Sequence, residues 1–132
     1  MARLYEIFSG EELKIAEKIQ RRRYQMLVHS YLYYEMNENI ISDSQWSSWA
    51  MELADLQSKY PHIASKVIFA EDFADWDGSS GAFLEYRDKP NIVVTANRLL
   101  WDRQKKQNPT ISIPIPKKPL INKTNTAKKK LF

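Results

Sequence analysis

Apolar residues recur at helical spacing along two neighbouring stretches in the first half of the chain. From Gly10 to about Met36 they lie three or four positions apart, which predicts one long helix. The same spacing predicts a second helix that ends near Tyr60. Its apolar positions are Trp46, Trp49, Ala50, Leu53, Leu56 and Tyr60. The two stretches together predict an antiparallel helical hairpin over residues 10–60, with Trp49 in its core.

The predicted helix ends carry residues that can bond the unpaired backbone groups there. Ser42 followed by Gln45 is typical of a capping box at the start of the second helix. Ser9 followed by Glu12 predicts another capping box at the start of the first helix. Asn37 is expected to end the first helix, because asparagine tolerates left-handed backbone angles.

The region after the hairpin predicts a third helix and allows short strands. Apolar residues at i, i+1, i+4, i+7 and i+8 favour a helix from Asp88 to about Gln107. The β-branched run Ile92–Thr95 is also compatible with a strand, but the helical periodicity outweighs it. Short strands over residues 1–8 and 83–87 are possible from their composition. The predicted fold class is therefore mainly α, a helical hairpin plus a third helix.

The end of the chain differs in composition from the rest. Four prolines lie between Pro109 and Pro119, and each lacks a backbone N–H, so a helix is excluded and a central strand is disfavoured. An extended, polyproline-like basic arm is predicted over residues 108–132, attached to a helical domain of residues 1–107. Its ending, Leu131-Phe132 after three lysines, is a candidate linear motif, with a solubilising tail as the alternative.

Charge divides the chain more sharply than its net value of +4 suggests. Residues 1–102 hold 11 basic and all 16 acidic residues, a net charge of −5, whereas residues 103–132 hold nine basic residues and no acid. An acid-free basic segment is typical of contacts with nucleic-acid phosphates or acidic surfaces. The candidate contact residues in this segment are Lys105, Lys106, Lys117, Lys118, Lys123, Lys128, Lys129 and Lys130.

Three consecutive arginines, Arg21, Arg22 and Arg23, lie in the middle of the first predicted helix. Consecutive helical residues point in different directions, so the three guanidinium groups cannot all face one partner. The favoured interpretation is a solvated basic collar. The functional alternative, in which one or two of them contact a phosphate or an acidic surface, makes them further candidate contact residues.

Residues that commonly carry catalysis or bind metals do not form suitable patterns. The chain has no cysteine, and its two histidines, His29 and His62, lack metal-ligand spacing. Asp72, Asp75 and Asp77 do not match a calcium loop, so turn-forming roles are favoured and no metal site is expected. No nucleophile elbow or phosphate-binding glycine loop is present, which favours a protein that is not an enzyme. Without a long apolar run or a signal peptide, a cytoplasmic location is expected.

The stretch from His29 to Pro61 resembles the small N-terminal helical domain of bacterial NAD-dependent DNA ligases. The resemblance runs without a gap and covers about a quarter of the chain. In those ligases this domain binds the nicotinamide mononucleotide half of NAD with aromatic residues and carboxylates. The resemblance therefore implies a nucleotide site at Tyr33, Tyr34, Asp43 and Trp46, with NAD or its mononucleotide, NMN, as the ligand.

The resemblance is incomplete at the positions that would hold the nucleotide. Tyr33 and Asp43 keep the residue types of the ligases, and Trp46 replaces a tyrosine with another flat ring. Tyr34 replaces a histidine and Ser47 replaces an aspartate, so an imidazole and a carboxylate are lost. Weak or no binding of NAD and NMN is therefore expected.

The lysine that carries the adenylate in the K-x-D-G motif of DNA ligases is missing. The nearest sequence is Asp75-Trp76-Asp77-Gly78, in which an acid stands where the nucleophilic lysine would be. A carboxylate cannot form the required phosphoramidate, so ligase chemistry is excluded. The layout from Phe69 onward resembles small ligase-like proteins of phages of Gram-positive bacteria, which would place this chain in the host cytoplasm.

Two classes of function follow from these patterns. The first is a non-enzymatic binding protein of phage origin that engages nucleic acid or a nucleoprotein complex. This class includes an inhibitor of a host or defence enzyme, such as a CRISPR effector. The second is an NAD- or NMN-binding module that acts as a sensor, sponge or hydrolase. The first is favoured, because half of the ligase residue types are lost while the basic segment carries no opposing acid.

Overall fold

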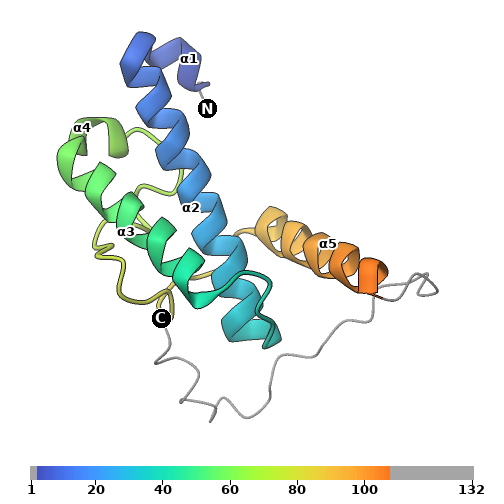
Figure 1. Ribbon diagram of the computed structural model, residues 1–132. Helices are drawn as coiled ribbons and strands as arrows, with labels where there is room; N and C mark the ends of the chain where they lie inside the picture. The colour runs from blue at the N-terminus through green and yellow to red at the C-terminus, as the bar shows by residue number, and fades with distance from the viewer. Residues whose placement is uncertain (1–2, 108–132) are drawn as a thin grey trace.

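The computed structural model describes residues 3–107, which form helices joined by turns (Figure 1). The helices are α1 (Leu4–Ile7), α2 (Gly10–Met36), α3 (Asp43–Lys59), α4 (Pro61–Ala64) and α5 (Pro90–Gln107). The mainly helical fold class is confirmed, and α2 and α3 form the predicted hairpin. The arm predicted over residues 108–132 lies outside the described residues. No helix between residues 3 and 107 is long and apolar enough to cross a membrane.

The short strands that the sequence allowed over residues 1–8 and 83–87 do not form, since no strand occurs between residues 3 and 107. The first segment contains the one-turn helix α1, where the backbone N–H of Arg3 donates to Glu6 Oε1 at 2.7 Å. Residues 83–87 form turns and irregular chain. A strand needs a partner strand for its backbone groups, and the neighbouring elements here are helices.

α2 is the central element, because α1, α3, α4 and α5 all pack against it (Figure 1). The core-facing positions of α3 and α5 repeat every three or four residues, as the apolar periodicity predicted. They are Trp46, Ala50 and Leu53 on α3, and Ile92, Ala96 and Leu100 on α5. α2 is buried on more than one side, with Ala16, Ile19, Met26, Leu27, Val28, Leu32 and Met36 among its buried apolar residues.

Two of the three residues predicted to cap a helix do so. Asn37 ends α2 in the left-handed conformation with φ of 57°, and Ser42 Oγ accepts from the backbone N–H of Gln45 at 3.0 Å. The capping box predicted at Ser9 is wrong, because its side chain makes no capping hydrogen bond. Gly10, the next residue, has φ of 60°, so the chain enters α2 without the helical angles that a capping box requires.

α5 begins at Pro90, two residues later than the apolar pattern predicted. Proline suits the first helical position, because its fixed φ fits the helix and the missing N–H would have no partner there. The preceding residue, Lys89, is 7% exposed and pairs with Asp72 at 2.8 Å. The start of α5 is therefore fixed to the segment that precedes it.

The segment between α4 and α5 has no regular structure over most of its length but is packed closely on the hairpin. Trp76 is 6% exposed, and its Nε1–H donates to the backbone carbonyl of Ala50 on α3 at 3.0 Å. Gly78 has φ of 83°, and a Cβ at this position would lie 2.8 Å from Sδ of Met51. Only glycine combines that backbone angle with this close approach. The segment thus forms a second layer over α3.

The relative burial of Trp46 and Trp49 generates a stability prediction. Trp46 is 1% exposed and Trp49 is half-buried, so the expectation that Trp49 lies in the core is corrected. Trp46→Ala should lower the free energy of unfolding by on the order of 3–5 kcal/mol. Trp49→Ala should cost about half as much, since part of its ring stays in water. Denaturant melts of both variants test this order, and equal losses would contradict it.

Candidate functional site

The residues that would form a ligase-like nucleotide site are divided between the interior and the surface. Tyr33 and Trp46 are 2% and 1% exposed, so both rings are covered. Trp46 Nε1–H donates to Ser30 Oγ at 3.3 Å, and its ring lies 6.0 Å from that of Trp76. Burial, with Tyr34 and Asp43 nearby, raises the pKa of Tyr33 to about 12, so its hydroxyl stays protonated. These two rings present no open face for stacking.

The two remaining candidates lie nearer the surface. Tyr34 is half-buried, its ring 4.9 Å from that of Tyr33, and its hydroxyl lies 3.4 Å from Ser80 Oγ. Asp43 is exposed in the first turn of α3. The structure therefore brings Tyr33, Tyr34 and Asp43 into one region, but the aromatic surface there is packed against the segment that contains Ser80.

Comparisons of this chain with protein-family models, with curated proteins and with solved structures found no match. The resemblance to the ligase domain therefore stays a prediction.

The three arginines of α2 do not form a solvated collar, so that interpretation is wrong for two of them. Arg21 is exposed, but Arg23 is 1% exposed and donates to backbone carbonyls and to Gln57. Arg22 is 14% exposed, and its guanidinium lies 5.4 Å from the Trp49 ring centroid. Arg21 alone of the three is open to a partner in this conformation.

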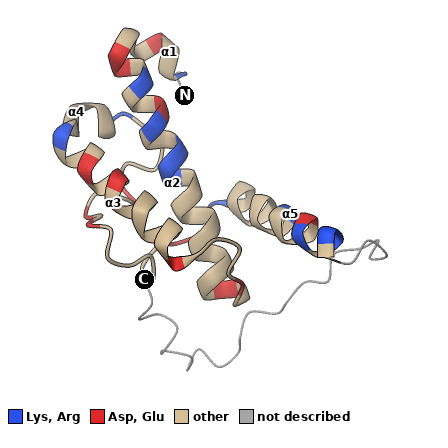
Figure 2. Ribbon diagram, viewed as in Figure 1, with Lys and Arg blue, Asp and Glu red and all other residues tan. Residues whose placement is uncertain are grey.

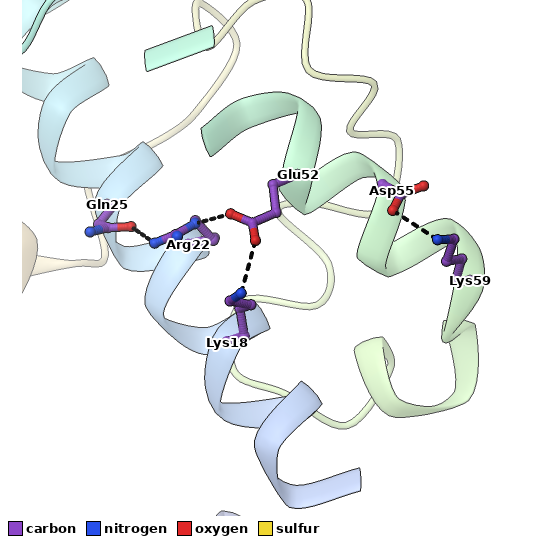
Figure 3. A network of polar contacts seen from close by, with 6 residues as sticks. All are labelled: Lys18, Arg22, Gln25, Glu52, Asp55 and Lys59. Carbon is purple, nitrogen blue, oxygen red and sulfur yellow. Dashed lines mark hydrogen bonds and ion pairs between the residues drawn. The ribbon is translucent and has the colours of Figure 1, made fainter. Parts of the chain in front are cut away.

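Arg22 belongs to a network of polar contacts between α2 and α3 (Figure 3). Glu52 accepts from Arg22 Nε at 2.7 Å and pairs with Lys18 at 3.0 Å, while Arg22 Nη1 donates to Gln25 Oε1 at 2.6 Å. The hydrogen bond from Arg22 is the main cause that lowers the pKa of Glu52. The network joins the two helices of the hairpin, so Arg22 has a structural role.

The C-terminal half of α5 is the basic region of the described structure that lies next to residues 108–132. Lys105 and Lys106 in this half, and Arg98 just before it, are exposed and have no carboxylate partner between residues 3 and 107. Lys105 Nζ lies 5.2 Å from the Trp101 ring, a cation–π distance. Arg103 contacts the turn between α2 and α3, because its Nη1 donates to the backbone carbonyl of Asn39 at 2.6 Å. Figure 2 shows the basic residues at this end of α5.

The other predicted contact residues lie outside the described part of the chain. They are Lys117, Lys118, Lys123, Lys128, Lys129 and Lys130. Their sequence position places them after the basic end of α5, and their role stays a prediction.

Two of the three aspartates that raised the question of a metal have other partners. Asp72 pairs with the buried Lys89 at 2.8 Å, and Asp77 accepts from the backbone N–H of Ser79 at 2.9 Å. Although burial opposes the charged form, the carboxylates of Asp72 and Asp88 raise the pKa of Lys89. No group of three or more potential metal ligands comes together among residues 3–107.

Sequence reasoning missed the exposed apolar residues beside the segment that covers α3. Met51 and Phe83 are 56% and 52% exposed. Met51 follows the apolar Ala50 and gave no separate signal, and Phe83 begins a stretch for which a short strand was one possibility. A partial signal exists for Met51, because it lies off the stripe formed by Trp46, Ala50 and Leu53.

His29 is a half-buried, uncharged side chain whose Nδ1 atom is shielded from solvent. Burial lowers the pKa of its imidazole to about 4, and its ring lies 5.8 Å from that of Trp49. Nδ1 has no hydrogen-bond partner among residues 3–107. The ring therefore packs against Trp49, and protonation would place a charge in a partly desolvated position.

The lowered pKa of His29 predicts a loss of stability in acid. Above pH 6.5 His29 is neutral in both the folded and the unfolded protein. Below that pH the unfolded chain binds a proton at His29, whereas the folded protein binds it only near pH 4. Wild type should therefore lose up to about 3 kcal/mol through this group as the pH falls from 6.5 to 4. Over the same pH range the free energy of unfolding of His29→Phe, measured in denaturant melts, should fall by about 3 kcal/mol less than that of wild type.

His62 provides the matched control, because it is exposed and lies 3.5 Å from Glu12. His62→Gln should keep the pH dependence of wild type. If His29→Phe keeps it as well, His29 is protonated in the folded protein and the neutral ring is refuted.

Proposed function

We propose that this chain is a non-enzymatic binding protein that engages nucleic acid or a nucleoprotein complex through its basic C-terminal part. The resemblance to phage ligase-like proteins supports a phage origin. Within that setting the protein acts as a binder or inhibitor of a host or defence enzyme, such as a CRISPR effector. A cytoplasmic location belongs to the same proposal.

The observation that carries this proposal is the unpaired basic end of α5. Lys105 and Lys106 in the last turn, and Arg98 in the middle of the helix, have no acidic partner among residues 3–107. α5 packs on α2 away from α3 and α4 (Figure 1). From Arg103 to the last residue the chain contains no acid. A run of unopposed positive charge attracts a phosphate backbone and releases its counterions on binding.

The alternative, an NAD- or NMN-binding module, is less well supported. Tyr33 and Trp46 are covered, so the stacking surface that the ligase resemblance implies is not open. Calorimetric titration with NAD and NMN should detect weak binding or none. A low-micromolar constant that Asp43→Ala abolishes would favour this alternative over the proposal.

The proposal predicts binding to duplex DNA with a steep dependence on salt. The logarithm of the affinity should fall with the logarithm of salt concentration by about 0.9 for each phosphate neutralised. If six of the nine charges after residue 102 engage, the affinity should fall roughly a thousandfold between about 50 and 200 mM salt. Fluorescence anisotropy with labelled duplex at several salt concentrations measures this slope.

Variants assign that binding to its residues. Lys105→Glu with Lys106→Glu, and deletion of residues 117–132, should each weaken binding and leave the melting temperature unchanged. Arg21→Glu is the matched control, because Arg21 is exposed on α2, and it should bind like wild type. A truncated protein that keeps full affinity, or that loses its fold, would contradict the proposal.

A further inference from the structure

Two large exposed apolar side chains, one on α3 and one on the segment after α4, are linked through the residues that lie between them. Met51 is 56% exposed and Phe83 is 52% exposed. The Phe83 ring lies 6.0 Å from that of the buried Trp76, whose Nε1–H donates to Ala50, the neighbour of Met51. Gly78 lies so close to Met51 that a Cβ on it would be 2.8 Å from Met51 Sδ. We name this surface, Met51 and Phe83 over Trp76 and Gly78, the acidic-apolar face.

The backbone under this face is fixed, so the two side chains are displayed on a rigid support. Trp76 is anchored to α3 by its hydrogen bond and to Phe73 by a ring contact at 5.0 Å. Asp77 accepts from both the backbone N–H and the hydroxyl of Ser79, at 2.9 and 2.6 Å, which closes the turn. A surface that is ordered before binding costs little conformational entropy when a partner docks.

The surroundings of the face are acidic and contain no positive charge over long stretches. The chain has no lysine or arginine from residue 24 to 58 or from 67 to 86, and these ranges supply ten acids. Asp75 and Asp77, the residues before and after Trp76 in the sequence, are exposed, and Glu85 is exposed two residues after Phe83. None of these three carboxylates has a cationic partner among residues 3–107, in contrast to Glu52 on the same helix as Met51. Figure 2 shows acidic residues on α3 and on this segment.

We infer that the acidic-apolar face is a docking surface for a lysine- or arginine-rich segment of another protein that carries an apolar side chain. The apolar side chain would seat against Met51 and Phe83, and the flanking cations would meet Asp75 and Asp77. Charge complementarity selects this occupant, because an acidic partner would be repelled and an uncharged one would leave the carboxylates unpaired.

This inference is independent of the proposed function, since it uses none of the basic residues of α5. It gives the protein a second surface of opposite sign, on α3, while α5 packs elsewhere on α2 (Figure 1). A nucleic-acid-binding protein exposes basic segments of the required kind, so one molecule of this chain offers complementary charge to both components of a nucleoprotein complex.

The test uses the full chain and a short fluorescent peptide of lysine, glycine and serine with one central phenylalanine. Anisotropy should show binding that weakens at least about tenfold when the peptide phenylalanine is replaced by serine. Phe83→Ser and Met51→Gln should each weaken binding to a similar degree. Val94→Ser, at a valine 60% exposed on α5, is the matched control and should bind the peptide like wild type.

A second pair of variants leaves the apolar residues intact. Asp75→Asn with Asp77→Asn should lower the affinity and flatten its salt dependence, and both substitutions keep the hydrogen-bond acceptors. Equal affinity for the phenylalanine and serine peptides would overturn the inference. So would an affinity that Phe83→Ser and Met51→Gln leave unchanged. If deletion of residues 108–132 tightened peptide binding, the face would bind the C-terminal part of this same chain, and the inference would be wrong. A dimer that Phe83→Ser dissolves would assign it to a second copy and equally overturn the inference.

Discussion

Arg23 is 1% exposed, and its guanidinium group bonds parts of the chain that are far apart in sequence. Its Nε–H donates to Gln57 Oε1 on α3 at 2.9 Å, and Nη2 donates to the carbonyl of Ala64 at 3.0 Å. Nη1 donates to the carbonyls of Val67 and Ile68 at 2.9 and 3.0 Å. Burial lowers the pKa of Arg23 to about 10, opposed by the charge of Asp72, so the group stays charged at neutral pH. A cation so far from water is tolerated only where its donors are satisfied, and these carbonyls satisfy them.

The contacts that begin at Arg23 continue through the segment that leads to both proposed surfaces. Gln57 accepts from Arg23 and donates through Nε2 to the carbonyl of Phe73 at 2.9 Å. Phe73 packs on Trp76, which is bonded to α3 and supports the acidic-apolar face. Asp72, next to Phe73, pairs with Lys89 directly before α5. The irregular segment therefore has a defined conformation, because the carbonyls of Val67, Ile68 and Phe73 bond to the hairpin and Asp72 pairs with Lys89. The face on α3 and the basic end of α5 both depend on this arrangement.

The helices were predictable because their apolar periodicity is local, but the burial of single residues was not. The sequence of Arg21, Arg22 and Arg23 contains three identical side chains, and what distinguishes Arg23 is a set of carbonyls 41 to 45 residues later. Those carbonyls belong to a segment without periodicity, so their position cannot be derived from pattern. The same segment determines which tryptophan of α3 is buried. Trp46 lies next to Trp76 of this segment, whereas Trp49 lies next to Arg22 and His29. The candidate nucleotide residues could be named from the ligase resemblance, but their covering by this segment could not.

The stability of Arg23→Met against that of Arg21→Met tests most directly whether this buried cation organises the fold. Both variants remove one guanidinium from adjacent positions of α2, and only the first leaves three carbonyls and Gln57 without their donor. Each buried group left unpaired costs about 1–3 kcal/mol, so Arg23→Met should lower the free energy of unfolding by at least about 3 kcal/mol in a denaturant melt. Arg21→Met should stay within about 0.5 kcal/mol of wild type. An Arg23→Met protein as stable as Arg21→Met would show that the segment is held by other contacts, and would contradict the account.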